Sequence, residues 1–488
     1  MMSWLKRLTG SPWLLVWLGL FVFAYAWLAS LLLQLWVIPT LFSQPGAAEG
    51  LVVLDSIGFD GIAKVKAAEI ASLGWSAWEL RPQTHSPAGI ASAFYAIFGP
   101  APSSMLPFNA AVHAISTCLV MMILRNFFSN APALIGAVVF TLNPASFEWV
   151  AQIHRDGVFI LGNLLLIVGV MGFVGKADAI GSKSLKHGTH MLALSIIGSL
   201  LVWVARPYWI QVTLVAVVLT VIYLVLVLLF QRPHFKWRRA GGLAVLYIGL
   251  LMFQLWLIRF HTPNEAIDIP AQIVASANGQ NGQNGQNGQN GQNGQNGQNG
   301  QNGHLDRQSA NEQGFTWKRS GWTWKPSGWL PKTIEGRMYR IAIIRLGAIS
   351  QGGATLVDAN RTLDSVAAIV QYLPRAFQLG MLSPLPEFWV GQGSTPAMTI
   401  ARKVMGGGTP VFYFCLLGLI VGLYRMRKNV LFWVMVGMCC FGILVYAVTY
   451  PNIGTLMRFR FGFYMLLIGF GVAFWFDLWM KRNKGGAL

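Results

Sequence analysis

Long apolar runs separated by short polar segments dominate the pattern along this chain. A helix needs about 20 residues to cross the hydrocarbon core of a bilayer, and several of these runs approach or exceed that length. The runs lie at about 12–37, 106–124, 131–147, 158–174, 191–205, 209–230, 243–258, 410–424, 430–448 and 461–480. The pattern predicts an all-α polytopic membrane protein with about ten transmembrane helices.

Basic residues between the runs predict how the chain is oriented. Lys6 and Arg7 precede the first run, QRPHFKWRR follows the sixth, and KRNK follows the last. Lys and Arg are enriched in cytoplasmic loops, so we expect these segments inside and both termini in the cytoplasm. The alternate loops are then external. Residues 88–98 are apolar but too short to span, which favours a helix at the interface.

The polar segments divide the chain into three regions. Residues 1–258 form an N-terminal transmembrane module whose first external loop covers 38–105, residues 259–409 form an external region, and residues 410–488 hold the last helices. Within the external region, the NGQ repeats at 278–303 contain no apolar residue and predict a disordered linker. We expect deletion of these repeats to leave folding intact.

Two further segments of the external region have a recognisable pattern. The duplicated TWKRSGW and TWKPSGW at 316–329 combine Trp and Lys, which is typical of the membrane–water interface. Residues 356–386, with a helix expected at about 362–372, are predicted to form a small cap over the outer face.

Composition narrows the classes of function. The chain is 54% hydrophobic and 11% charged, against about 25% charged residues in soluble domains. Its net charge of +19 does not indicate nucleic acid, because much of the Lys and Arg orients the spans and no nucleic-acid-binding module appears. The cysteines lie inside apolar runs without metal-ligand spacing, so disulfides and structural metal are not expected.

The first external loop carries a large share of the acidic residues. Asp55, Asp60, Glu69 and Glu79 lie in residues 54–87 of a chain with 17 Asp and Glu. A carboxylate there can deprotonate an acceptor hydroxyl or hold a divalent cation. Asp55 follows the first span directly and is the first candidate, and Asp60 is the second. Either could instead cap a helix that begins near residue 61, and Glu69 and Glu79 are expected on the surface.

Other polar residues fall at the external ends of spans. His85 lies in a turn stiffened by prolines and is a secondary candidate for contact with a phosphate or a sugar hydroxyl. A second group, between the third and fourth spans, could cap two helix ends or could place an acid opposite Asp55 and cations near a phosphate. This group consists of Glu148, His154, Arg155 and Asp156.

Three external arginines are candidates for phosphate binding. Arg206, Arg458 and Arg460 lie where the positive-inside tendency would not place them. Guanidinium groups bind phosphate oxygens in a bidentate manner. On a helix, Arg458 and Arg460 would diverge, and on an extended chain they would share a face. Contact with lipid headgroups is the alternative reading.

Several segments together resemble a known family. They are a first external loop with an Asp, a PxxxxxPAG segment followed by FYAIFG, then LPFNAAVHAIS, FTLNP, QIHRDGVFILG and a terminal NxGTLxRFR. This order resembles the GT-C superfamily of membrane glycosyltransferases, near the bacterial protein-mannosyltransferase and aminoarabinose-transferase-like group. The resemblance covers about residues 13–175, and the remainder matches in topology.

The resemblance implies a GT-C-like fold in a bacterial inner membrane and a periplasmic, inverting sugar transfer. The donor would be a polyprenyl-phosphate sugar and the acceptor an envelope glycan, lipid or protein. In the family, the first-loop Asp is the base or a metal ligand, a position that Asp55 matches best and Asp60 second. Arginines hold the donor phosphate. Ser56 stands where the family often has a second acid, which favours a base over a Mg²⁺ or Mn²⁺ site.

Three other classes of function stay open on the sequence. A lipid-linked polysaccharide polymerase or ligase would rely on His and Arg of the large external loop. A transporter would show broken helices at mid-membrane and repeated halves, and neither is evident here. A non-catalytic membrane protein of envelope polysaccharide assembly would need none of the candidate residues for chemistry.

Overall fold

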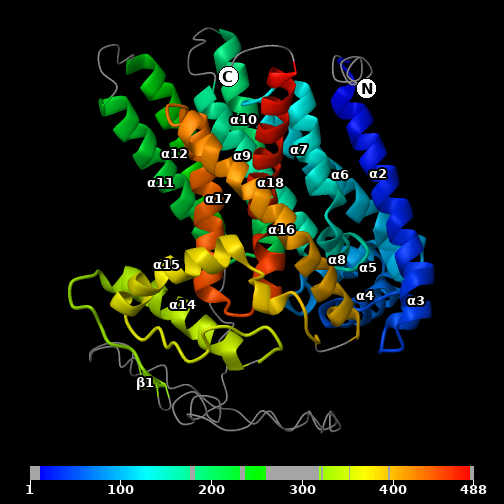
Figure 1. Cartoon of the computed structure of the whole chain (residues 1–488). Coiled ribbons are helices and arrows are strands. Elements are labelled where there is room, and N and C mark those ends of the chain that lie inside the picture. The colour runs from blue at the N-terminus through cyan, green and yellow to red at the C-terminus, as the bar shows by residue number, and fades with distance from the viewer. Residues whose placement is uncertain are drawn as a thin grey trace.

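A computed structural model describes residues 11–175, 182–230, 237–259, 318–319, 322–350, 352–393 and 396–483. Helices make up most of it, so the predicted all-α class is confirmed (Figure 1). The sheet found among the described residues is a short antiparallel pair, β1 (Lys318–Arg319) and β2 (Trp322–Thr323). The NGQ repeats lie outside the described residues.

The helices follow the apolar runs closely. The first half of the chain forms α2 (Leu14–Leu32), α3 (Ile38–Leu41), α4 (Leu54–Leu73), α5 (Ser86–Phe98), α6 (Leu106–Leu124), α7 (Asn130–Leu142), α8 (Phe147–Val150), α9 (Asp156–Gly175), α10 (Ser182–Ala205), α11 (Trp209–Phe230) and α12 (Trp237–Arg259). The second half forms α14 (Lys332–Ser350), α15 (Val366–Leu382), α16 (Pro396–Arg425), α17 (Val430–Thr449) and α18 (Ile453–Arg482).

Eight of the helices in the described part of the chain are long and apolar enough to cross a membrane. The pair formed by α7 and the segment Pro144–Val150 bends by 53° and would make a ninth span if counted as one. The apolar part of α12, Ala244–Arg259, is shorter than a full span within the described residues. The chain is therefore a helical multi-pass membrane protein. The eight helices fall on eight of the ten predicted runs, and the predicted count of about ten is not confirmed for the described residues.

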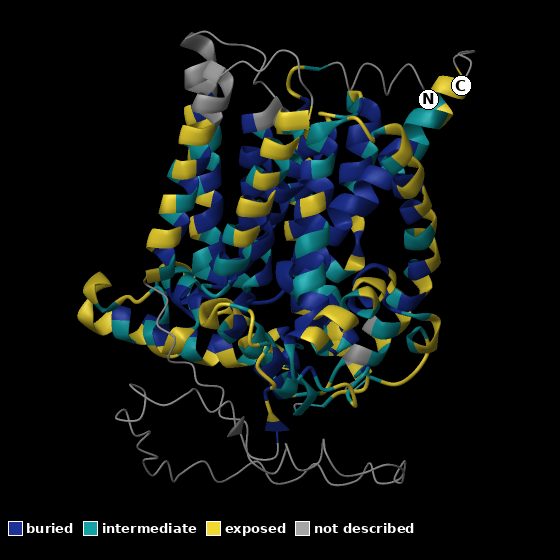
Figure 2. Ribbon diagram, turned by 90° about the vertical axis from the view of Figure 1, so that its left-hand side faces the viewer, coloured by how far each residue is buried: buried dark blue, intermediate teal, exposed yellow. Residues whose placement is uncertain are grey.

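The spanning helices run between the same two ends of a bundle (Figure 1). The first described turn of α2 and the last turn of α18 lie together at one end, and α4, α5, α8, α14 and α15 gather at the other, which we call the capped end (Figure 1). The outward faces of the spanning helices are exposed and apolar, whereas the faces between helices are buried (Figure 2). The exposed apolar faces suit contact with lipid.

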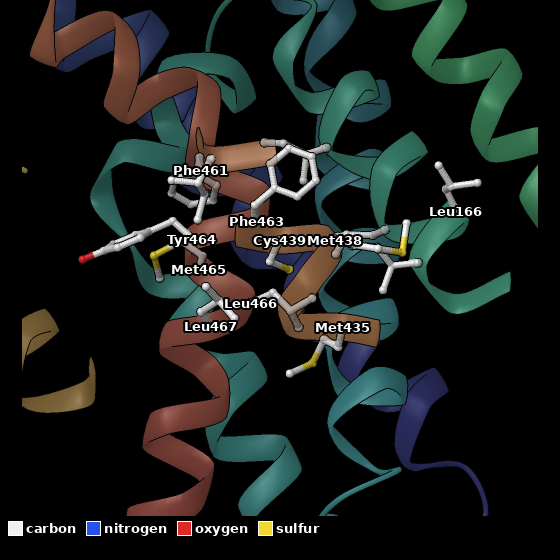
Figure 3. Close-up of a cluster of buried hydrophobic side chains, with 14 of the residues drawn as sticks. Leu166, Met435, Met438, Cys439, Phe461, Phe463, Tyr464, Met465, Leu466 and Leu467 are labelled. Carbon is white, nitrogen blue, oxygen red and sulfur yellow. The ribbon is translucent and has the colours of Figure 1, made fainter. Parts of the chain in front are cut away.

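Helix α18 lies at the centre of the bundle. Its middle turns pack against α17 and α9 through the large buried side chains drawn in Figure 3, among them Phe463, Leu466 and Met435. On another face, α18 approaches α7 closely, because a Cβ atom on Gly136 would lie 2.5 Å from the backbone oxygen of Gly469. Close helix approach through small residues is a common mode of packing in membranes.

Several boundaries differ from those predicted. Helix α4 begins at Leu54 rather than near residue 61, so Asp55 lies in its first turn and Asp60 lies inside it. Helix α16 begins at Pro396 and passes through Pro410, and α18 begins at Ile453. Proline and polar residues at these positions suggested loops, but tertiary packing continues the helices through them.

The cap is larger and more ordered than the sequence suggested. Helix α14 was not predicted, and α15 extends through Pro374 to Leu382. Trp322 and Trp324, expected at the membrane interface, are instead buried, with Trp324 packed against Tyr339 and its Nε1 donating to Glu335 Oε1 at 3.2 Å. Trp322 of the first repeat and Trp324 of the second therefore help to form the core of the cap, whereas Trp329 is exposed.

A candidate active site at the capped end

A cluster of charged side chains assembles at the capped end from segments far apart in the chain. Asp55 comes from the first turn of α4 and Glu148 from α8. His154 lies in the loop between α8 and α9, and Asp156 is the first residue of α9. Arg458 comes from the second turn of α18, and Arg206 joins from the connection between α10 and α11. We call these six residues the charged cluster.

Arg458 connects the three acids of the cluster. Its Nη2 lies 3.5 Å from Asp55 Oδ2, its Nη1 donates to Glu148 Oε1 at 3.4 Å, and its Nε lies 3.3 Å from Asp156 Oδ2. The side chain is 15% exposed, whereas that of Asp55 is 46% exposed. The guanidinium thus contacts one buried acid, Asp156, and two that are partly exposed, Glu148 and Asp55.

Asp156 occupies the buried floor of the cluster. Its Oδ1 accepts a hydrogen bond from Arg206 Nη2, and Arg206 Nη1 donates to the Tyr446 hydroxyl at 2.7 Å. The guanidinium of Arg206 also stacks over the ring of Phe459, 3.8 Å from its centroid, and over the ring of Phe159 at 4.6 Å. Aromatic faces and one carboxylate therefore compensate a fully buried cation.

His154 lies between two carboxylates. Its Nδ1 is 3.1 Å from Asp156 Oδ2, and its Nε2 is 3.8 Å from Asp55 Oδ2. Burial lowers the pKa of His154, but Asp156 and then Asp55 outweigh burial and raise that pKa above 6.5. Conversely, the interaction with His154 and the charge of Arg458 outweigh burial and hold the pKa of Asp55 to about 2.

Asp60 lies apart from the charged cluster. Its carboxylate is buried, accepts a hydrogen bond from the Tyr95 hydroxyl at 2.6 Å and pairs with Lys64 at 2.8 Å. The hydrogen bond from Tyr95 joins α5 to α4, whereas the pair with Lys64 lies within α4. Because Asp60 is five residues beyond Asp55 on the same helix, it points to a different side from Asp55.

His85 approaches the cluster through an aromatic ring. It precedes α5, and its ring centroid lies 5.2 Å from that of Phe59, which in turn lies 6.5 Å from the ring of His154. Glu69 and Glu79, expected on the surface, both bind Lys66 at 2.8 Å and are more than two-fifths exposed.

Arg460 points away from the cluster, as expected for residues two apart on a helix. It is buried, and its guanidinium donates to the backbone carbonyls of Leu379, Gly380 and Ser383 at the end of α15. The same guanidinium lies 4.1 Å from the Tyr464 ring centroid. Arg460 therefore fastens the cap to α18, and both of its Nη atoms are already engaged.

Arg155 lines a cleft beside the cluster. The cleft lies between α5, α6, α9 and α10, has room for about one water molecule, and is lined by Ser86, Pro87, Ile90, Met105, Phe108, His154, Arg155, Val158, Val204 and Ala205. Most of these side chains are apolar. The charge of Arg155 helps to lower the pKa of Asp55, so its guanidinium lies near the cluster.

Three buried amides hold the loops that carry the cluster. Gln152 accepts from the backbone N–H of Val52 at 3.0 Å and donates to Gly50 O at 2.9 Å, just before α4 begins. Asn109 donates to Gln152 O at 2.9 Å, and Gln34 donates to Ala151 O at 3.0 Å. These amides were not among the residues predicted from the sequence. Each is a single amide side chain inside or beside an apolar run, and this pattern marks it, because an amide is costly to bury without hydrogen-bond partners.

No group of three or more His, Cys, Asp or Glu side chains suited to a metal ion occurs in the described ranges of the chain. The carboxylates of the cluster face Arg458 instead of converging on one point. Comparison of the chain with protein-family models, with curated proteins and with solved structures gives no match.

Proposed function

We propose that this protein is an inverting glycosyltransferase that uses a polyprenyl-phosphate-linked sugar at the outer face of the membrane. The observation that carries the proposal is Asp55, a half-exposed carboxylate at the capped end, flanked by the cation of Arg458 and the imidazole of His154. A base and a cation side by side suit the transfer of a sugar from a phosphate to a hydroxyl group. The acceptor would be an envelope glycan, lipid or protein.

Asp55 would act as the base for the acceptor hydroxyl. Its exposure lets an acceptor approach, and no residue of the described cluster screens it completely from solvent. A positioned general base typically contributes a factor of about 10²–10⁴ to the rate. Asp60 would not share this role, because Tyr95 and Lys64 already engage its carboxylate.

Arg458 and Arg155 would bind the donor phosphate. In an inverting transfer the leaving phosphate gains negative charge, and fixed cations stabilise that charge in the transition state. Arg206 and Arg460 are both fully buried and have hydrogen-bond partners, so we assign them supporting roles. The cluster has three carboxylates, and three guanidinium groups balance their charge: Arg206 and Arg458 within the cluster and Arg155 beside it. The site therefore has no excess of negative charge that would repel a phosphate.

The cleft beside Arg155 supports a lipid-linked donor. Ile90, Phe108 and Val158 make its walls apolar, while His154 and Arg155 make one end polar. The cleft as it stands has room for about one water molecule, so a donor with an apolar chain and a charged head would have to widen it to contact both surfaces. A water-soluble nucleotide sugar would gain nothing from the apolar walls, and the chain has no glycine-rich nucleotide-binding fingerprint.

Purified protein in lipid nanodiscs, supplied with a radiolabelled polyprenyl-phosphate sugar and membrane acceptors, tests the proposal. We expect transfer by the unsubstituted protein, and a loss of at least about 100-fold with Asp55→Asn. Glu69→Gln, on an exposed position of the same helix, is the matched control and should retain transfer.

Two outcomes would favour other functions. Full turnover by Asp55→Asn together with its loss in Arg460→Ala would favour a polysaccharide polymerase or ligase. Absence of transfer from every polyprenyl-phosphate sugar tested would favour a non-catalytic assembly protein.

A further inference from the structure

An apolar stripe runs along the exposed side of the cap helix α15. It is formed by Ala367, Val370, Pro374 and Phe377, whose spacings of three and four residues place them on one face of the helix. Val370 is 56% exposed and Phe377 is 44% exposed. A row of exposed apolar side chains on a helix that is otherwise packed marks a surface for a partner.

The other sides of α15 are packed or polar. Ile369 and Ala376 are buried, on the same side as Gly380, which packs against α17. Gln371 and Gln378 are exposed beside the stripe. The exposed side of α15 is therefore apolar along one edge and polar along the other, which is the pattern of a helix that lies at a boundary between lipid and water.

The stripe faces away from the rest of the cap. Tyr372 Oη donates to Asp358 Oδ2 at 3.1 Å, Arg375 Nε donates to the same atom at 3.1 Å, and a hydrogen bond from α14 also reaches the Tyr372 hydroxyl. Residues two apart on a helix point in nearly opposite directions. Val370 is two residues before Tyr372, and Phe377 is two residues after Arg375. Because α14 lies farther from the bundle than α15, the stripe is turned towards the membrane (Figure 1).

The end of α15 lies within the depth of the spanning helices. A Cβ atom on Gly380 would lie 2.7 Å from Cγ1 or Cγ2 of the facing α17 residue, Ile443, so the two helices are in close contact there. Ile443 is six residues before the end of α17 at Thr449, which corresponds to about 9 Å along the helix axis. Helix α17 is a span of 20 residues, about as long as the hydrocarbon core is thick. The end of α15 thus reaches the hydrocarbon boundary, and the helix runs across the end of the bundle (Figure 1).

The same end of α15 adjoins an apolar surface suited to lipid. Leu382, the last residue of α15, is exposed, and its backbone carbonyl accepts a hydrogen bond from Tyr413 Oη of α16 at 2.6 Å. Val411 and Phe414, close to Tyr413 in the sequence, are exposed on this spanning helix. The cap helix therefore begins where the apolar outer surface of the bundle ends.

We propose that the stripe of α15 inserts into the membrane leaflet at the capped end. Its apolar side chains lie at the boundary between headgroups and acyl chains, and Gln371 and Gln378 face water. The partner is a phospholipid surface, which receives the apolar face of an amphipathic helix to a depth of about 5–10 Å. The inference rests on packing and exposure, so it does not depend on the proposed glycosyltransferase function.

Insertion of the stripe ties the charged cluster to the depth of the lipid headgroups. Arg460 binds the backbone carbonyls at the end of α15, and Arg458 lies two residues before it on α18. Helix α15 is thereby the connection between the leaflet and the helix that carries Arg458. The phosphate of a lipid-linked substrate lies at this same depth.

Photocrosslinking in nanodiscs of phosphatidylcholine and phosphatidylglycerol tests the inference. The photoreactive residue p-benzoylphenylalanine replaces Val370 or Phe377, and the adducts are identified by mass spectrometry after irradiation. We expect phospholipid adducts at both positions. Gln371, exposed on the polar edge of the same helix, is the matched control, and its yield of lipid adduct should be lower by at least about fivefold.

Two results of this experiment would overturn the inference. One is crosslinking of position 370 mainly to a second copy of the chain or to another segment of the same chain, because the stripe would then be a protein interface. The other is an equal yield of lipid adduct at positions 370 and 371, because the apolar edge would then have no preference for the leaflet.

Hydrogen exchange in the same nanodiscs gives a second measurement. Val370→Glu places a charge in the leaflet, so exchange across residues 366–375 should accelerate at least about fivefold. Gln371→Glu adds the same charge at the neighbouring exposed position and should leave exchange within about twofold of the unsubstituted protein. Unchanged exchange in Val370→Glu would overturn the inference.

Discussion

The Nη2 atom of Arg458 lies 3.5 Å from Oδ2 of Asp55, which ties the last helix of the bundle to the first turn of α4. The candidate site therefore forms only when the two ends of the chain have packed against each other. The same guanidinium reaches Glu148 and Asp156, so one side chain holds acids from three separate segments. Loss of Arg458 should consequently affect both the stability of the bundle and the proposed chemistry.

Arg458→Gln should lower the free energy of unfolding by about 3 kcal/mol, because it removes one of the two cations that compensate the buried Asp156 and the cation that Glu148 and Asp55 share. Thermal or denaturant unfolding in detergent measures this change. Arg425→Gln, an exposed arginine at the opposite end of the bundle, should change stability by no more than about 0.5 kcal/mol. Equal stabilities for the two variants would contradict the role of Arg458 as the common partner of the acids.

Asp60→Asn tests whether the Asp60 carboxylate contributes to stability and not to turnover. We expect a loss of about 2 kcal/mol in stability, because the Tyr95 hydroxyl and Lys64 lose a charged partner. Turnover per folded molecule should stay within about twofold of the unsubstituted protein, in contrast to Asp55→Asn. A large loss of turnover without any loss of stability would return Asp60 to the candidate base residues.

Arg460→Ala should loosen the cap without removing a phosphate ligand. Three backbone carbonyls at the end of α15 would lose their donors, so hydrogen exchange should accelerate at least about tenfold across residues 376–383. The affinity for a polyprenyl phosphate, corrected for the folded fraction, should be little changed. A complete loss of phosphate binding with unaltered exchange would show that Arg460 contacts the donor.

Protonation of the Asp55 carboxylate should lower the stability of the protein in acid. Its pKa is about 2 in the folded protein and 3.8 ordinarily, so its contribution is present above about pH 4 and is lost as the pH falls towards 2. Asp55→Asn lacks a titrating group there and should lose less stability than the unsubstituted protein between pH 4 and pH 2. Unfolding midpoints measured across this range test the difference, and parallel curves for the two proteins would contradict it.

Much of the architecture follows from local properties of the sequence. Apolar runs of about 20 residues can satisfy their backbone hydrogen bonds in a membrane only as helices, so their number and order determine the bundle. Alternation of the runs also placed Asp55, Glu148, His154, Arg206 and Arg458 at one end, because consecutive antiparallel helices return the chain to the same side. The structure bears out this gathering of residues.

The partners of each polar side chain were decided by tertiary structure. Arg206, Arg458 and Arg460 form one group in the sequence pattern, yet Arg206 binds a buried carboxylate, Arg458 bridges three acids and Arg460 binds the carbonyls of α15. Asp60 and Asp55 are likewise neighbours in the sequence, although the continuation of α4 through both residues turns them to different sides. Pairing depends on helix rotation and on contacts between distant segments, and neither can be calculated from residue type and hydropathy alone.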